Sequence, residues 1–219
     1  SAGLINNSDA TINGGTLRYN SSTAYSKALT FTSGTLAGTN WNGGLSGQSI
    51  GAGKTISPGN SPGTAATGAE TWANGGTYVW EINNATGTAG TDPGWDLLSG
   101  SGTLAITATS AMPFNIDVTS LTLANVAGDA TNFVPATQYS WLIADFANPI
   151  TTFDATAFNV NTTGFSNAFT GTFAVALGGT GAVPGDNSQV YVTYVPEPAT
   201  MGLLAIGALA VLRRRRRRA

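Results

Sequence analysis

Residues 77–83 read TYVWEIN, and the alternation in this stretch predicts the fold class. Side chains point to opposite faces in turn along an extended chain, so Tyr78, Trp80 and Ile82 share one face. The residues between them share the other face, which includes a carboxylate that prefers water. The stretch therefore predicts a β-strand in a sheet with one buried and one solvated face.

Similar short segments recur outward from this stretch, separated by clusters of Gly, Asn, Asp and Ser. β-branched and aromatic residues favour strands, and the clusters favour turns. The further predicted strands are 103–107, 114–119, 139–144, 172–177 and 189–195. No stretch before Ala199 keeps a helical period, so the sequence predicts an all-β protein.

A Gly-Thr-Leu triplet recurs at 15–17, 34–36 and 102–104, with related triplets at 76–78 and 171–173. The first two copies lie 19 residues apart, close to the length of one coil of a parallel β-helix. Each coil would place its leucine or aromatic residue inside and its glycine at a corner that needs positive φ. Residues 57–63, SPGNSPG, predict two successive type II turns.

These motifs also carry a resemblance. The order LxGxN, ISPGNSPGT, GGTYVWEIN and then DLLSGSGTLAI at 96–106 resembles the C-terminal part of autotransporter-like passenger domains. Those domains are built from autotransporter-associated β-strand repeats. Over residues 15–106 the resemblance implies a right-handed parallel β-helix.

Residues 110–194 have longer alternating segments and more aromatic residues than the part before them. Aromatic residues spaced in this way are more typical of a core than of a ligand groove. We expect a β-sandwich-like capping region here that covers the open end of the helix and its edge strands. The aromatic residues are Phe133, Tyr139, Trp141, Phe146, Phe153, Phe158, Phe165, Phe169 and Phe173.

The C-terminal residues carry a three-part pattern. Val195, Pro196, Glu197 and Pro198 precede an apolar run at 199–212. Six arginines follow it: Arg213, Arg214, Arg215, Arg216, Arg217 and Arg218. Basic flanks remain on the cytoplasmic side of a membrane segment, because charges at bilayer depth are costly. The run of 14 residues is shorter than a usual span of about 20, but a buried core helix is not expected to end in six like charges.

The order of Pro-Glu-Pro, short apolar helix and arginine cluster resembles the PEP-CTERM sorting signal of exported bacterial proteins. The resemblance implies processing near Val195–Pro198 by an exosortase-type enzyme. It also implies one short C-terminal transmembrane helix, with Arg213–Arg218 as the charges retained in the cytoplasm. The protein would be anchored transiently in the inner membrane and then reach the cell surface, outer envelope or extracellular matrix. The alternative is a solvated basic tail on a soluble domain.

The predicted organisation is therefore a β-helix-like repeat region at 1–109, a β-rich capping region at 110–194 and a sorting signal at 195–219. Ser1–Leu4 lack the features of a secretory signal peptide, so we expect a mature or partial chain. The loop at 178–188 is expected to close a hairpin.

Composition limits the chemistry. The chain has no cysteine and no histidine, which excludes disulfides, thiol nucleophiles, Cys/His zinc sites and a histidine base. Only Arg18, Lys27 and Lys54 precede the arginine cluster, against 11 acidic residues, so the net charge of that part is 3 − 11 = −8. No aromatic residue is interleaved with the arginines, and no nucleic-acid partner is expected. No cofactor or metal is expected either.

The best candidate for a polar site is TDPGWD at 91–96. Asp92 and Asp96 could bind calcium or perform acid–base chemistry, with Trp95 as a platform for a sugar ring. The alternative is a turn in which Asp92 accepts hydrogen bonds from backbone amides and Trp95 is half-buried.

Three functions are compatible with these features. The first is a non-catalytic surface or matrix protein associated with exopolysaccharide, which the sorting tail and the acidic polar surface favour. The second is a carbohydrate-binding adhesin, which would need an exposed stacking surface formed by Trp41, Trp72 or Trp95. The third is a β-helical enzyme that degrades polysaccharides through Asp92 and Asp96.

Overall fold

The computed structural model describes residues 9–21, 23–41 and 47–198, and this part of the chain is all-β. It contains sixteen strands and one 3₁₀ turn, η1 (Ala155–Ala157), and no α-helix. The strands are β1 (Ala10–Tyr19), β2 (Leu29–Gly38), β3 (Gln48–Ile50), β4 (Lys54–Pro58), β5 (Thr64–Thr67), β6 (Glu70–Trp72), β7 (Thr77–Ile82), β8 (Thr88–Ala89), β9 (Gly94–Trp95), β10 (Leu97–Gly100), β11 (Leu104–Ile106), β12 (Phe114–Ser120), β13 (Tyr139–Phe146), β14 (Phe158–Gly164), β15 (Thr172–Leu177) and β16 (Gln189–Val195).

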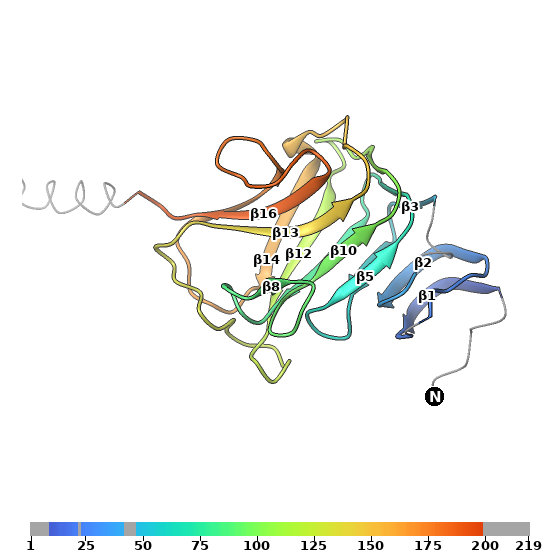
Figure 1. Ribbon diagram of the computed structural model, residues 1–219, viewed down its shortest axis with the longest axis horizontal. Coiled ribbons are helices and arrows are strands. Elements are labelled where there is room, and N and C mark those ends of the chain that lie inside the picture. Colours follow the sequence, from blue (N-terminus) through green and yellow to red (C-terminus); the bar gives the residue numbers. More distant parts are fainter. Residues whose placement is uncertain (1–8, 22, 42–46, 199–219) are drawn as a thin grey trace, which may run out of the picture.

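The strands form three sheets, which we call A, B and C. Sheet A has the order β1-β2-β4-β7-β12-β14, with β9 paired to β7 and β8 paired to β9, and sheet C has the order β11-β6-β3. Sheet B has the order β15-β16-β13-β10-β5. Neighbours along the main paths of A and C are parallel, as are β5, β10 and β13, whereas β16 is antiparallel to both β13 and β15. Figure 1 shows β1 and the end of β16 at opposite ends of the long axis.

The register of sheet A explains the triplet repeat. The first two Gly-Thr-Leu copies lie side by side, because Leu17 pairs with Leu36. The same column continues through Ile56 to Tyr78 of the Gly-Thr-Tyr copy. The copies at 102–104 and 171–173 instead lie at the starts of strands in sheets C and B. The repeat therefore marks a common register for three of its five copies.

One glycine of the repeat is required by geometry. Gly34 has a φ of +103°, and a Cβ atom there would lie 2.5 Å from the carbonyl oxygen of Gly15. Any other residue would be strained by its φ and would collide with the neighbouring strand. The positive φ expected of the repeat glycines is confirmed at Gly15 and Gly34 and is wrong at Gly76, Gly102 and Gly171.

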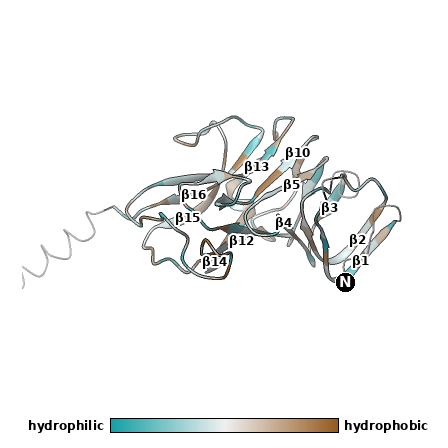
Figure 2. Cartoon of the chain, turned by 60° about the horizontal axis from the view of Figure 1, so that its bottom comes forward, coloured by the Kyte–Doolittle hydropathy of each residue, from teal (hydrophilic) through white to brown (hydrophobic). Residues whose placement is uncertain are grey.

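The alternation in TYVWEIN is confirmed. Tyr78, Trp80 and Ile82 have no exposed surface, and the residues between them are half-buried. Polar atoms of the buried rings are also bonded: the Tyr78 hydroxyl donates to the carbonyl of Ile143 at 3.0 Å. Trp80 Nε1 donates to the carbonyl of Asp96 at 2.9 Å. Figure 2 shows the hydrophilic and hydrophobic bands that this alternation produces along strands such as β10 and β13.

The predicted aromatic core is also confirmed. Trp141 stacks on Tyr139 with ring centroids 4.8 Å apart, and Phe173 lies 5.0 Å from Tyr194. Trp41 and Trp72 are 1% and 0% exposed, so the idea that either offers a stacking surface to a sugar is wrong. Their indole rings fill the core because they lie on the inward side of the chain. Of the three tryptophans proposed for that surface, only Trp95 is half-buried.

Two turn predictions have different outcomes. The loop at 178–188 connects the antiparallel strands β15 and β16, as expected of a hairpin loop. In SPGNSPG, Gly59 has the positive φ (+76°) that a type II turn requires, but Gly63 does not. The second type II turn is therefore wrong: Gly63 leads directly into β5, and its N–H donates to the Asp96 carboxylate at 2.9 Å.

Two further predictions concern the organisation of the chain. Ladders β7–β12 and β10–β13 cross the proposed boundary at residue 109, and the division into regions 1–109 and 110–194 stays a prediction. The apolar run at 199–212 and the six arginines lie outside the described residues. Within the ranges that are described, no helix is long and apolar enough to cross a bilayer.

Candidate functional site

The predicted sorting residues follow the last strand of the fold. β16 lies between β13 and β15, and Tyr194 pairs with Tyr139 on one side and Phe173 on the other. Val195 is the last residue in the sheet and pairs with Thr172 only on the β15 side. Strand pairing therefore continues to the first residue of the motif and ends there.

Tyr194 ends the buried part of the chain. Its side chain has no exposed surface, and its hydroxyl donates to the carbonyl of Pro135 at 2.8 Å. The same hydroxyl accepts a hydrogen bond from the N–H of Gly171 at 3.2 Å. Both loops beside β16 are thus held to one phenol. A cut upstream of Tyr194 would remove this residue and expose the core that it covers.

Exposure changes abruptly at the next residue. Val195 is 49% exposed, and Glu197 and Pro198 are exposed in an irregular segment after β16. A processing enzyme needs access to an extended, unpaired backbone, and this segment provides it without any loss of strand pairing. Val195, Pro196, Glu197 and Pro198 form one continuous segment, in which Pro196 is half-buried and the other three residues are exposed. Arg213–Arg218 lie outside the described residues.

Asp96 is the most buried residue of the predicted polar site. It has no exposed surface, and its two carboxylate oxygens accept hydrogen bonds from the backbone N–H groups of Gly63 and Glu81, each at 2.9 Å. Burial, and then the nearby charge of Glu81, raise the pKa of Asp96 well above its usual range. The carboxyl group thus connects the turn before β5 with β7 through hydrogen bonds, which is a structural role.

Asp92 is bound in a different way from the predicted turn. Its oxygens accept hydrogen bonds from Asn83 Nδ2 at 2.7 Å and Asn125 Nδ2 at 2.6 Å, rather than from backbone amides. Asn83 is itself fully buried, and its Oδ1 accepts a hydrogen bond from the N–H of Gly94 at 2.8 Å. Trp95 is half-buried, as the turn interpretation expected, and its Nε1 donates to the carbonyl of Leu142 at 2.9 Å.

Asp92 and Asp96 form separate sets of hydrogen bonds. Each carboxylate holds together segments of the chain that are distant in sequence, and none of these bonds is shared between the two. In the part of the chain that the structure describes, no group of three or more His, Cys, Asp or Glu side chains could hold a metal ion. A sugar or calcium site at Asp92, Trp95 and Asp96 stays a prediction.

Glu70 is a buried acid that the sequence reasoning missed. It is 2% exposed, at the start of β6, and accepts a hydrogen bond from Trp72 Nε1 at 3.3 Å. Its Oε1 and the hydroxyl of Thr67 are buried without a hydrogen-bond partner. Burial raises the pKa of Glu70 to about 7. The alternation E-T-W, with both ends inward, could have indicated this burial.

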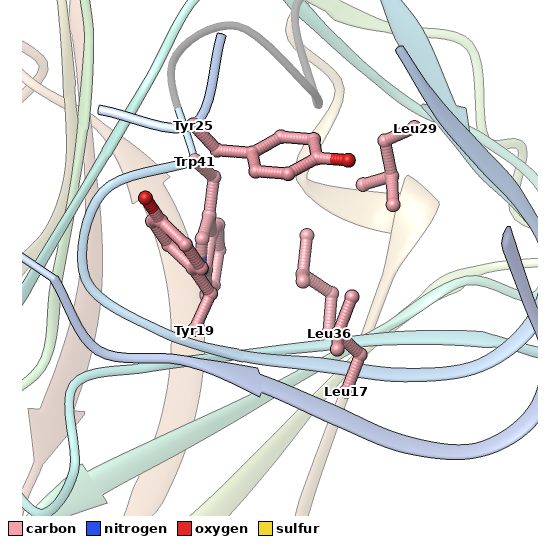
Figure 3. Close-up of a pocket in the computed structure, with 6 residues that line it drawn as sticks. All are labelled: Leu17, Tyr19, Tyr25, Leu29, Leu36 and Trp41. Carbon is pink, nitrogen blue, oxygen red and sulfur yellow. The ribbon is translucent and has the colours of Figure 1, made fainter. Parts of the chain in front are cut away.

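A small apolar hollow lies near the β1 and β2 end of the molecule (Figure 3). Its lining residues are Leu17, Tyr19, Tyr25, Leu29, Leu36 and Trp41. The two tyrosine hydroxyls donate to the carbonyls of Thr23 at 2.9 Å and Ala28 at 3.3 Å, which occupies their donor protons. The hollow offers packing surface rather than groups for acid–base chemistry.

Comparison with known families bears on the C-terminal residues alone. A family model described as the PEP-CTERM protein-sorting motif matches residues 195–217. Comparison with curated proteins and with solved structures returned no match. The matched segment starts at the residue where strand pairing ends, so the boundary of the motif and the boundary of the fold coincide. The chain therefore carries a PEP-CTERM sorting motif, the signal of an exported bacterial protein that is sorted through exosortase.

Proposed function

We propose that the protein is a non-catalytic component of the cell surface or extracellular matrix that associates with exopolysaccharide after export. The observation that carries the proposal is the abrupt change at Val195: Tyr194 is fully buried within β16, whereas Val195, Glu197 and Pro198 are exposed. Processing there would release an intact domain.

We further propose that the domain is a right-handed parallel β-helix with a capping region in its C-terminal part. The chain visits sheets C, A and B in the same order three times, through β3-β4-β5, through β6-β7-β10 and through β11-β12-β13. Parallel pairing in each sheet supports this coil arrangement, and the right hand follows the general preference of parallel crossovers. The antiparallel strands β15 and β16 then extend sheet B as the proposed cap.

The outward face of sheet A supports the exopolysaccharide proposal. Thr35, Thr55, Thr77 and Asn115 pair in one column and are half-buried, and Asn159 extends the column by donating to Asn115 Oδ1 at 3.0 Å. Neighbouring strands are spaced by about 4.8 Å, so hydroxyls and amides repeat at that interval. Such a row can form successive hydrogen bonds with a hydroxyl-rich polymer.

Replacing Thr35, Thr55 and Thr77 together by valine is expected to weaken binding to the host exopolysaccharide by about tenfold or more. Three hydrogen bonds of about 0.5–1.5 kcal/mol each are lost, and about 1.4 kcal/mol corresponds to a factor of ten. Valine retains the β-branched shape, and the triple serine variant is the matched control because it keeps the hydroxyls. Co-sedimentation with purified exopolysaccharide measures the effect. Equal binding by the valine and serine variants would contradict a role for this column.

Processing is expected to give a mature C-terminus within residues 195–198. Mass spectrometry of the protein from the surface fraction of its host measures this end directly. An end upstream of Tyr194 would contradict the proposal, because such a cut would remove paired residues from β16. An intact Arg218 in a soluble cytoplasmic fraction would contradict export. Release of reducing or unsaturated sugar ends from exopolysaccharide would contradict the non-catalytic role.

A further inference from the structure

We propose that the end of the domain where β16 leaves the sheet lies against the lipid headgroup layer until the chain is processed. The partner is the surface of a bilayer, and the contact is set by a short tether. This inference rests on the proposed function for export and processing, and on the sequence prediction that the apolar run at 199–212 is inserted in the membrane. We call this part of the domain the exit end and define it by Val134, Pro135, Gly171, Thr172 and Val195.

The exit end is a single surface. Tyr194 holds Pro135 and Gly171 to the last strand through the two bonds of its hydroxyl, and Thr172 is the strand partner of Val195. Pro135 is exposed, so the loop it belongs to faces outward beside the exit point. No rearrangement of the fold is needed to bring these segments together.

Val134 gives this surface an apolar group. Its side chain is 51% exposed, although its backbone is fixed because its N–H donates to the Tyr139 hydroxyl at 2.9 Å. Val195, also half exposed, lies on the same end of the domain. Fixed, exposed aliphatic side chains on one surface favour contact with a phase less polar than water.

The tether is too short to hold the domain away from the membrane. Only residues 196–198 separate Val195 from the apolar run. A fully extended chain covers about 3.3–3.6 Å per residue, so Val195 and Ala199 lie at most about 14 Å apart. A helix of 14 residues is about 21 Å long, which is shorter than a hydrocarbon core of about 30 Å, and such a mismatch would draw the flanking residues into the headgroup layer.

Charge does not supply the attraction. The three described basic residues are Arg18, Lys27 and Lys54. Arg18 and Lys27 belong to β1 and the loop after it, at the opposite end of the long axis from the exit point (Figure 1). Anionic lipids are bound through clustered Lys and Arg side chains, which the exit end lacks among its defining residues. The contact is therefore expected in neutral as well as anionic vesicles.

The absence of cysteine from the chain allows a direct test. The full chain is reconstituted in phosphatidylcholine vesicles that contain a lipid-bound quencher, with one fluorescent label on Val134→Cys. The matched control carries the label on Thr11→Cys, which is exposed on β1 at the far end. We expect several-fold stronger quenching at position 134 than at position 11.

A second variant tests the tether itself. A Gly/Ser linker of about 20 residues inserted between Pro198 and Ala199 has a mean span of about 25 Å and should abolish the difference between the two labels. Equal quenching at both positions in the unmodified chain, or strong quenching at position 134 that survives the linker, would overturn the proposal. Co-flotation separates the causes of failure. A chain that does not float with vesicles contradicts the anchoring, whereas a floating chain without quenching contradicts only the contact.

Discussion

Replacement of Trp72 by alanine is expected to lower the free energy of unfolding by about 3–5 kcal/mol, since the ring is fully buried. Trp72 stacks on Phe114 with ring centroids 4.8 Å apart and planes inclined by 3°. It also contacts Tyr78 and Phe158 edge-on, at 5.9 and 6.1 Å. Trp72 belongs to sheet C and the other three rings to sheet A, so a cavity at Trp72 would loosen the contact between the two sheets.

Part of this effect is polar. Trp72 Nε1 donates to the buried Glu70 carboxyl group, and a buried acceptor that loses its donor costs about 1–3 kcal/mol. Trp72→Phe retains a ring but removes the donor, so it is expected to lose less stability than Trp72→Ala. The comparison separates packing from hydrogen bonding.

Urea unfolding followed by far-ultraviolet circular dichroism measures both variants without relying on tryptophan fluorescence. Trp95→Ala is the matched control, because Trp95 is only half-buried and should cost less. An unchanged midpoint for Trp72→Ala would contradict the placement of this ring in the core.

Glu70 alone is expected to make the free energy of unfolding fall by about 3 kcal/mol as the pH rises from 4.5 to 7. Burial raises the pKa of Glu70 from 4.5 to about 7 in the folded protein. Between these values the folded protein binds more protons than the unfolded chain, so stability decreases as pH rises. Below pH 4.5 the contribution is fully present, and above pH 7 both states are ionised and the decrease ends.

The Glu70→Gln variant supplies the control, because glutamine has nearly the same shape and does not titrate. The difference in unfolding free energy between the two proteins, measured by urea unfolding at a series of pH values, is expected to change across this window. Asp96, whose pKa is also raised, is present in both proteins and is removed by the subtraction. A difference that does not vary with pH would contradict a buried, titrating Glu70.

Local alternation predicted six of the strands, β7, β11, β12, β13, β15 and β16, and the inward face of β7. A side chain in a strand points to the face opposite its neighbours, and this depends on no other part of the chain. The buried set Tyr78, Trp80 and Ile82 follows directly from it. The pairing of Leu17 with Leu36 could also be predicted, because only 19 residues separate the two and a short connection leaves little freedom in register.

Where the connection between two strands is longer, the sequence does not predict their register. Tyr78 and Ile116 occupy the same column but lie 38 residues apart, with β8 to β11 between them. The Gly-Thr-Leu copy at 102–104 does not keep the spacing of the first two copies, and it belongs to sheet C. A repeat spacing cannot be extrapolated across an insertion of unknown path.

The sorting motif was readable from sequence because its three parts are contiguous and depend on residue order alone. The polar site at 91–96 was not, because its contacts depend on residues that only folding brings together. Asp92 meets Asn83 and Asn125, which lie 42 residues apart from each other, and Asp96 reaches Gly63 from 33 residues away. Composition and alternation determined the strands, and contiguous residue order determined the sorting motif. The tertiary structure decided which polar side chains are buried, because burial depends on what packs against a residue and not on its neighbours in sequence.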